Sequence, residues 1–96
     1  MEGREMMVKS ILLDQNAKEW ITEVDEFVGL ISCIIDQKTQ NIKIYYVAKE
    51  GYAKRQIHVI DCGTNQKSEL NDSFSFLATL PQHDGNIVHH LFAAYE

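Results

Sequence analysis

The sequence has a single proline, five glycines and two cysteines in 96 residues, and it has no long apolar run. With so little proline and glycine and 45% hydrophobic residues, the chain is expected to fold rather than stay disordered. No stretch approaches the length that spans a bilayer, and the first residues lack the apolar core of a signal peptide. These absences predict a cytoplasmic protein without membrane contact, whose cysteines, Cys33 and Cys62, are free buried thiols rather than a disulfide.

Positive charge is also scarce. Nine lysines and arginines stand against 14 aspartates and glutamates, so the net charge is −5, and no basic run is longer than Lys54-Arg55. An acidic surface repels the phosphate backbone, which argues against direct binding of nucleic acid. An acidic protein can instead occupy a basic cleft on a protein partner.

The length fits one domain, residues 1–96, with residues 1–5 expected to be frayed. Its centre is residues 28–49, where two runs of β-branched and aromatic residues flank a short polar break, as in a β-hairpin. With a period of two, the first run is apolar on both faces. The second run places one apolar set on a single face, namely Ile42, Ile44, Tyr46 and Ala48. Such a hairpin needs cover on both sides, from a closed barrel, a sandwich or a partner chain.

Further strands are expected at residues 6–13, 55–62, 74–80 and 87–95, with a turn at Asp84-Gly85 between the last two. Residues 17–28 fit two patterns. Apolar residues recur there at helical spacing, and Asn16 with Glu19 would form a capping box, yet Trp20 and Val24 also fit a half-buried strand. Periodicity alone slightly favours a helix. The expected fold is all-β or mainly β, a small antiparallel barrel or roll of six to seven strands with at most one short helix.

The predicted core consists of large apolar residues on the inner faces of these strands: Ile31, Ile34, Ile44, Ile57, Val59, Phe74, Phe76 and Phe92. Replacing Phe76 by alanine is accordingly expected to cost about 3–5 kcal/mol. The hairpin carries more apolar residues than one small barrel can cover. The surplus would form an exposed aliphatic strip, which predicts a homodimer; the alternative is that a loop or residues 17–28 fold over that face.

Residues that could carry chemistry are few. His58 and Cys62 share a face of one strand, and a His-Cys-His cluster forms only if that face meets His90, because no CxxC or HxxxH spacing is present. The simpler interpretation is that the histidines hydrogen-bond at the boundary of a face. Cys33 lies among isoleucines with nothing nearby to activate it, and no glycine-rich phosphate loop exists. We therefore predict no catalytic residue, no metal ligand and no cofactor.

Aromatic and cationic residues gather near the end of the hairpin. Exposed tyrosine and arginine are frequent in binding patches, although tyrosines on strands are more often packing residues. The predicted binding residues are Tyr45, Tyr52, Lys54, Arg55, His58 and His90.

The order of short motifs along the chain resembles a known family. The motifs are Ile31-Ser32-Cys33, a hairpin with Asp36, Arg55-x-Ile57-x-Val59, Gly63-Thr64, Phe76-Leu77-Ala78-Thr79 and Gly85-x-Ile87-Val88-His89-His90-Leu91-Phe92. Over roughly residues 28–92 this order resembles a family of small, mostly uncharacterised bacteriophage and prophage proteins. This sequence departs from the family pattern at Asn65, Ala78 and His89. The resemblance implies an all-β fold with a strand at residues 18–24, and no shared catalytic signature.

These observations predict a non-enzymatic binding protein. It would be a phage or mobile-element accessory factor in the host cytoplasm that blocks a host defence protein or sequesters a small anionic, nucleotide-like ligand. The alternative is a small metal-assisted enzyme built on a histidine cluster.

Overall fold

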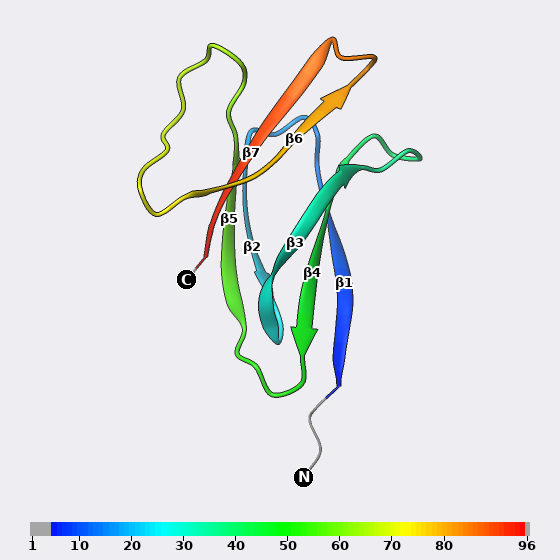
Figure 1. The fold of residues 1–96 in the computed structure, drawn as a ribbon, viewed down its shortest axis with the longest axis vertical. Helices are drawn as coiled ribbons and strands as arrows, with labels where there is room; N and C mark the ends of the chain where they lie inside the picture. The colour runs from blue at the N-terminus through cyan, green and yellow to red at the C-terminus, as the bar shows by residue number, and fades with distance from the viewer. Residues whose placement is uncertain (1–4, 96) are drawn as a thin grey trace.

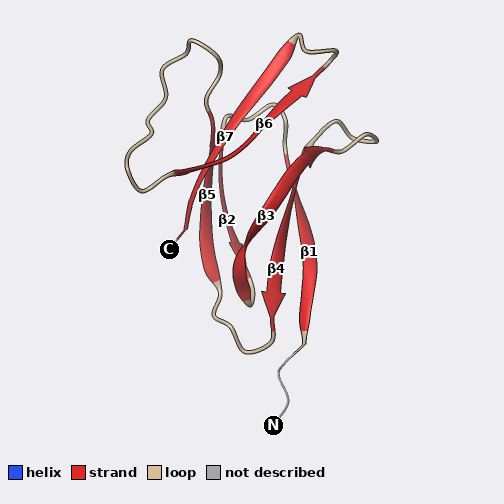
Figure 2. Cartoon of the chain, viewed as in Figure 1, coloured by secondary structure: helices blue, strands red, loops and turns tan. Residues whose placement is uncertain are grey.

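The computed structural model describes residues 5–95 and arranges them in seven strands (Figures 1 and 2). The strands are β1 (Met6–Leu13), β2 (Glu19–Val24), β3 (Phe27–Ile35), β4 (Ile42–Lys49), β5 (Arg55–Asp61), β6 (Ser75–Gln82) and β7 (Ile87–Tyr95). No helix occurs in this range, so none there could cross a membrane. Most of the segment predicted to be frayed, residues 1–4, lies outside the described residues, and Glu5 is exposed.

The strands form two antiparallel sheets that face each other. The three-stranded sheet has the order β1-β4-β3, and the four-stranded sheet has the order β2-β5-β7-β6. β3–β4 and β6–β7 are hairpins, and the β5–β6 connection stays within the four-stranded sheet, where β7 lies between those two strands. The β1–β2, β2–β3 and β4–β5 connections cross from one sheet to the other. The prediction of an all-β fold with six to seven strands is confirmed. A closed barrel is not found, because the residues from 5 to 95 divide into two separate sheets.

The core lies between the sheets, and its residues come from the central strands, where inward and outward side chains alternate regularly. On β4 the four residues predicted to share a face are all buried, and Ile44 is fully inaccessible. From the opposite sheet Ile57, Val59 and Leu91 are likewise fully buried. Ile44, Ile57 and Val59 were predicted core residues and are confirmed.

Two β-bulges in β3 break the period of two on which the other core predictions rest. Pairing with β4 shifts register between Phe27 and Gly29 and again between Leu30 and Ser32. Each bulge inserts one extra residue and reverses the faces that follow it. Ile31 is the extra residue of the second bulge and is 50% exposed. Ile34, 44% exposed, lies opposite Lys43 on the outer face, between Cys33 and Ile35, which lie opposite the buried Ile44 and Ile42. The assignment of Ile31 and Ile34 to the core was wrong.

A third bulge has the same effect in β6. Phe76 pairs with Phe92 and Ala78 pairs with Leu91, so Leu77 is the extra residue. Phe76 consequently faces outward, 61% exposed, with its ring edge-to-face against Phe92 at 5.6 Å between centroids. Its assignment to the core was wrong. Phe74 and Phe92 are only half-buried.

The ambiguous segment at residues 17–28 is strand β2 followed by a turn into β3. β2 pairs with β5 from Glu19↔Ile60 to Val24↔Arg55, and Trp20 and Val24 face inward. The helix favoured by periodicity is wrong, because pairing with β5 outweighs a weak local preference. The predicted capping box of Asn16 and Glu19 is also wrong, because the segment that follows Asn16 is strand β2 and not a helix.

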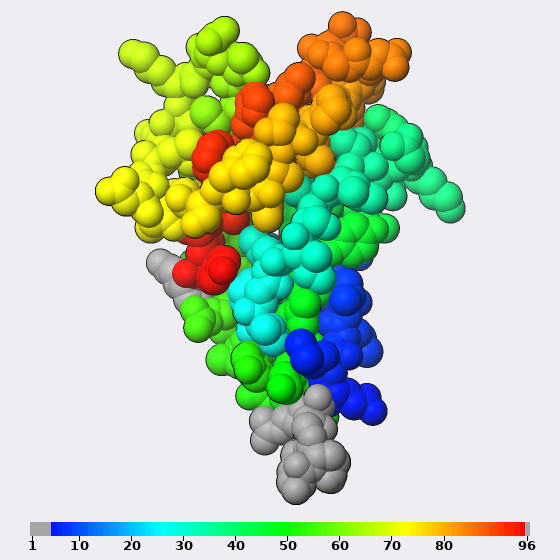
Figure 3. All heavy atoms as spheres, in the orientation of Figure 1, coloured from blue at the N-terminus to red at the C-terminus, as the bar shows by residue number. Residues whose placement is uncertain are grey.

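Three connections meet at one end of the sandwich, which we call the loop end. They are residues 14–18 between β1 and β2, 36–41 between β3 and β4, and 83–86 between β6 and β7 (Figure 1). The last contains the predicted Asp84-Gly85 turn, in which both residues have positive φ and the N–H of Asn86 donates to the carbonyl of His83. At one side of the sandwich β3 and β6 are in contact and lie next to each other across the visible surface (Figure 3).

Candidate functional site

The six predicted binding residues lie in three separate places. Tyr45 is on the outer face of the three-stranded sheet, and Tyr52, Lys54 and Arg55 lie at the end opposite the loop end. The two histidines, His58 and His90, are half-buried on the outer face of the four-stranded sheet. The structure therefore does not bring these residues together into one site.

At the end opposite the loop end, the cationic and aromatic residues contact their own chain. Nζ of Lys54 lies 3.7 Å from Oδ1 of Asp25, and Nζ of Lys49 lies 5.9 Å from the ring centroid of Tyr52. Exposed pairs of this kind contribute little to stability and leave both groups accessible. Arg55 begins β5 and is exposed.

The histidines on the four-stranded sheet are held by different partners. Nε2 of His58 pairs with the carboxylate of Glu19. His90 has Oγ1 of Thr64 2.7 Å from Nε2 and Oγ1 of Thr79 3.3 Å from Nδ1. Within residues 5–95 no three His, Cys, Asp or Glu side chains are placed to hold a metal ion. The metal-assisted alternative thus has no ligand set in this part of the chain.

A buried polar chain, which sequence reasoning missed, lies between the sheets near the loop end. Nδ1 of His89 is 2.6 Å from Oδ2 of Asp61, and Nε2 of His89 is 2.7 Å from Oε1 of Gln82. All three residues are at most 5% exposed. Strand parity is the signal that could have found them, because Asp61 continues the inward face of Ile57 and Val59.

Gln82 connects this buried chain to the loops of both sheets. Its amide nitrogen donates to the backbone carbonyl of Gln40 at 2.9 Å and to Oε1 of Gln15 at 3.1 Å. Because those partners are acceptors, the amide oxygen of Gln82 must be the atom that faces His89. The hydrogen bond to this oxygen then places a proton on Nε2 of His89, while Nδ1 contacts the carboxylate of Asp61.

An Asp–His pair is also the orienting half of a nucleophilic triad, but this one cannot serve as a base. The nitrogen that would accept a proton from a nucleophile is occupied by Gln82, and the ring is 3% exposed. Asp61, His89 and Gln82, all on the four-stranded sheet, therefore have a structural role: through Gln82 they tie this sheet to the β3–β4 connection.

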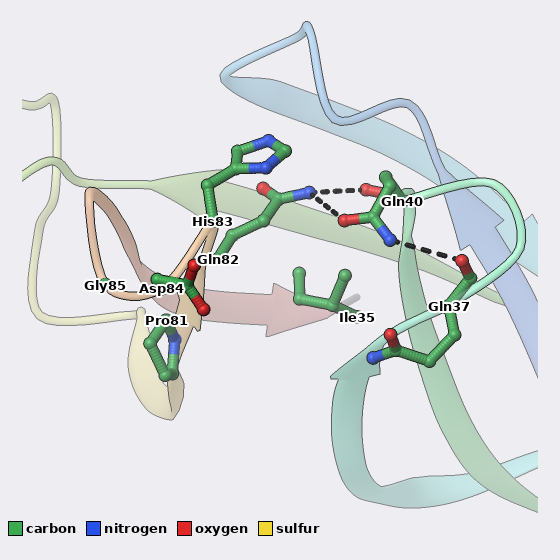
Figure 4. Close-up of a pocket in the computed structure, with 8 residues that line it drawn as sticks. All are labelled: Ile35, Gln37, Gln40, Pro81, Gln82, His83, Asp84 and Gly85. Atoms are coloured by element: carbon green, nitrogen blue, oxygen red, sulfur yellow. Dashed lines mark hydrogen bonds between the residues drawn. The ribbon is translucent and has the colours of Figure 1, made fainter.

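Gln82 also lines an open cleft at the loop end. The cleft measures about 600 Å³ and lies between the β3–β4 connection and the β6–β7 turn (Figure 4). Its lining is Ile35, Gln37, Gln40, Pro81, Gln82, His83, Asp84 and Gly85. Gln40 has φ 63°, an unfavourable conformation for a residue other than glycine, and its side chain contacts Gln82 and the carbonyl of Gln37. The cleft is rich in amides and contains no lysine or arginine.

The outer face of the three-stranded sheet, which we call the apolar face, carries the largest group of exposed aliphatic residues. The strand register places these residues next to one another on a continuous surface. Val8 is opposite Val47, Ser10 is opposite Tyr45, and Lys43 lies between Leu12 and Ile34. The exposed members are Met6, Val8, Leu12, Val28, Ile31 and Ile34, with exposed fractions from 38% to 61%. No element formed by residues 5–95 covers this face.

The charge on this sheet differs from that of the whole chain. Strands β1, β3 and β4 contain three lysines and no aspartate or glutamate, although the chain has 14 acidic residues. Lys43 reaches Oδ1 of Asp36 at 3.9 Å, on the adjoining loop. Register places two of the three lysines, Lys43 and Lys49, on the apolar face, whereas Lys9 lies opposite the buried Tyr46. The strands of the apolar face therefore add positive and no negative charge to it, in a protein that is acidic overall.

Comparison with known proteins does not show to which family this chain belongs. No protein-family model matches the chain, and no curated protein or solved structure matches it significantly.

Proposed function

We propose that this chain is a non-enzymatic binding protein that occupies a protein partner with its apolar face. The observation that carries the proposal is the row of exposed aliphatic side chains across β1 and β3, among them Val8, Leu12 and Ile34. Contiguous exposed apolar surface on a folded domain marks an interaction site far more often than scattered apolar residues do. Tyr45, in the middle of this face, is a residue type enriched at interfaces.

Charge indicates the chemistry of the partner. Lys43 and Lys49 lie among the aliphatic residues, and the three strands contribute no carboxylate to repel an acidic surface. A partner with an apolar patch rimmed by aspartate or glutamate would be complementary to this face. A phage or mobile-element factor that blocks a host defence protein needs only such a surface, and this is the biological setting that we propose.

Sequestration of a small anionic ligand has less support. A nucleotide-like ligand needs cationic or backbone N–H groups around its phosphates. The cleft at the loop end presents side-chain amides and the carboxylate of Asp84 instead. Its lining favours a neutral polar ligand over an anion.

Affinity purification from the cells that naturally produce the protein tests the proposal. Ile34→Asp places a carboxylate on the apolar face, while Ile21→Asp makes the same change at a comparably exposed isoleucine, 59%, on the four-stranded sheet. We expect wild type and Ile21→Asp to recover the same acidic protein, and Ile34→Asp to lose it.

Anionic lipid vesicles provide the opposing control. If wild type co-sediments with vesicles and Ile34→Asp does not, the apolar face binds membrane rather than protein, which would contradict the proposal. Recovery of the same partner by wild type and by both variants would also contradict the proposal.

A further inference from the structure

Four strands lie at sheet edges, and three of them are protected against pairing with another chain. β3 is interrupted by two bulges and contacts β6. β6 contains a bulge and Pro81, which has no N–H to donate. β2 has six residues, two of which are glutamates. Bulges, proline, charge and short length are the features by which sheet proteins prevent edge pairing.

β1 has almost none of this protection. It is eight residues long, pairs with β4 through eight successive residues without a register shift, and contains no proline and one charge, Lys9. Its other edge is unpaired, since backbone hydrogen bonds outside the strand ladders of residues 5–95 do not involve residues 6–13. β1 lies at the margin of the molecule with no element drawn beyond it (Figure 1). Every second residue thus directs its N–H and C=O outward.

We propose that β1 pairs antiparallel with β1 of a second copy of this chain, about a two-fold axis at Ser10. The two sheets would join into one of six strands in the order β3-β4-β1-β1-β4-β3. A two-fold contact requires a surface that is complementary to itself. A second copy of this chain is favoured as the partner because the sequence of β1 is complementary to itself in the register about Ser10.

The register about Ser10 places no like charges opposite each other. Val8 lies opposite Leu12 of the other copy, Met7 opposite Leu13, and Lys9 opposite Ile11. Val8 and Leu12 are 61% and 49% exposed in the single chain, and they would become cross-strand neighbours on the apolar face. The dimer would double the width of that face without covering it, so the inference does not depend on the proposed function.

Sedimentation velocity at micromolar concentration tests the pairing with two matched lysine substitutions. Leu12→Lys adds a charge to the β1 edge, whereas Ile34→Lys adds the same charge to the same face at the far side of the sheet. We expect wild type and Ile34→Lys to be dimers and Leu12→Lys to be a monomer. A monomeric wild type or a dimeric Leu12→Lys would overturn the proposal. Loss of the dimer in both variants would also overturn it, because it indicates packing through the face.

Disulfide trapping tests the register and does not depend on destabilising the dimer. In the proposed register the two Ser10 residues are directly opposite, at a Cβ separation suited to a disulfide. Ser10→Cys should form a covalent dimer on mild oxidation. Ser32→Cys, also exposed on the outer face but on β3, should not. Equal crosslinking of the two variants, or none with Ser10→Cys, would refute the two-fold axis at Ser10.

Discussion

The side-chain oxygen of Gln82 lies 2.7 Å from Nε2 of His89, and both side chains are buried between the two sheets. With Asp61 on the opposite side, the imidazole is held at both nitrogens. Through its amide nitrogen, Gln82 also reaches the connections before β2 and before β4. Gln82, held by this buried histidine, thus joins the four-stranded sheet to two connections at the loop end.

Removal of this histidine should be strongly destabilising. His89→Leu leaves the carboxyl group of Asp61 buried, and its Oδ1 already has no hydrogen-bond partner among the described residues. Breaking a buried pair on one side typically costs about 3–5 kcal/mol. Urea denaturation should show a loss of that size, while His83→Ala, at an exposed histidine, should change the free energy of unfolding little.

Replacing both members of the pair should be milder than replacing one. In Asp61→Leu/His89→Leu no uncompensated charge remains, and apolar replacements of buried pairs are often near neutral. We expect the double variant to be more stable than His89→Leu. A double variant whose loss equals the sum of the two single losses would show that the residues act independently.

The bulge in β6 determines the effect of truncating Phe76. Because the ring is outside and contacts Phe92, Phe76→Ala should cost about 0.5–1.5 kcal/mol, not the cost of opening a core cavity. Ile57→Ala, at a fully buried position, should cost about 2–5 kcal/mol. Thermal or urea unfolding measures the loss of stability in both variants. A larger loss for Phe76→Ala than for Ile57→Ala would mean that the Phe76 ring is buried and that the bulge in β6 lies elsewhere.

The two cysteines, both free thiols in the structure, should differ in reactivity. Burial raises the pKa of Cys33 to about 11, so at pH 8 about one thiol in a thousand is ionised. Iodoacetamide should modify the half-buried Cys62 of the native protein and leave Cys33 unmodified. Both should react after denaturation. Equally rapid modification of Cys33 in the native state would mean that β3 opens readily.

Asp36 should make stability dependent on acid pH. The hydroxyl and backbone N–H of Thr39 hold the pKa of this carboxyl group below its usual value, and Lys43 and Lys38 contribute further. Since the pKa is lower in the folded state, the stabilisation is present above the usual value and is lost as the pH falls through the folded pKa. The difference in unfolding free energy between wild type and Asp36→Asn should shrink from pH 7 to pH 3. A constant difference would exclude ionisation as its cause.

Strand number and the central faces could be predicted because alternation is regular on β4 and β5. Ile44, Ile57 and Val59 follow the period of two and are buried. Phe76 follows the same period in the sequence, yet the bulge in β6 turns it outward. Ile34 alternates regularly with Cys33 and Ile35, but β3 is apolar on both faces and only the inner face is covered. A bulge is determined by how two strands pair across space, so no count along one strand reveals it.

The site was harder to anticipate than the fold. Tyr52, Lys54 and Arg55 are neighbours in the sequence, which suggested a patch, but His58 and His90 lie on another face. The contacts that tie the loop end span up to 67 positions, as between Gln15 and Gln82. The apolar face was anticipated only as a surplus of aliphatic residues in the hairpin, because its members come from β1 as well as β3.

The most direct test of the proposed function is the affinity of the recovered partner, measured by isothermal titration calorimetry with purified proteins. We predict that Ile34→Asp binds at least about tenfold more weakly than wild type, which corresponds to about 1.4 kcal/mol, and that Ile21→Asp binds as wild type does. Added salt should weaken wild-type binding, because it screens the attraction between Lys43 and Lys49 on the apolar face and the acidic residues of the partner. Equal affinity for wild type and Ile34→Asp would contradict the account.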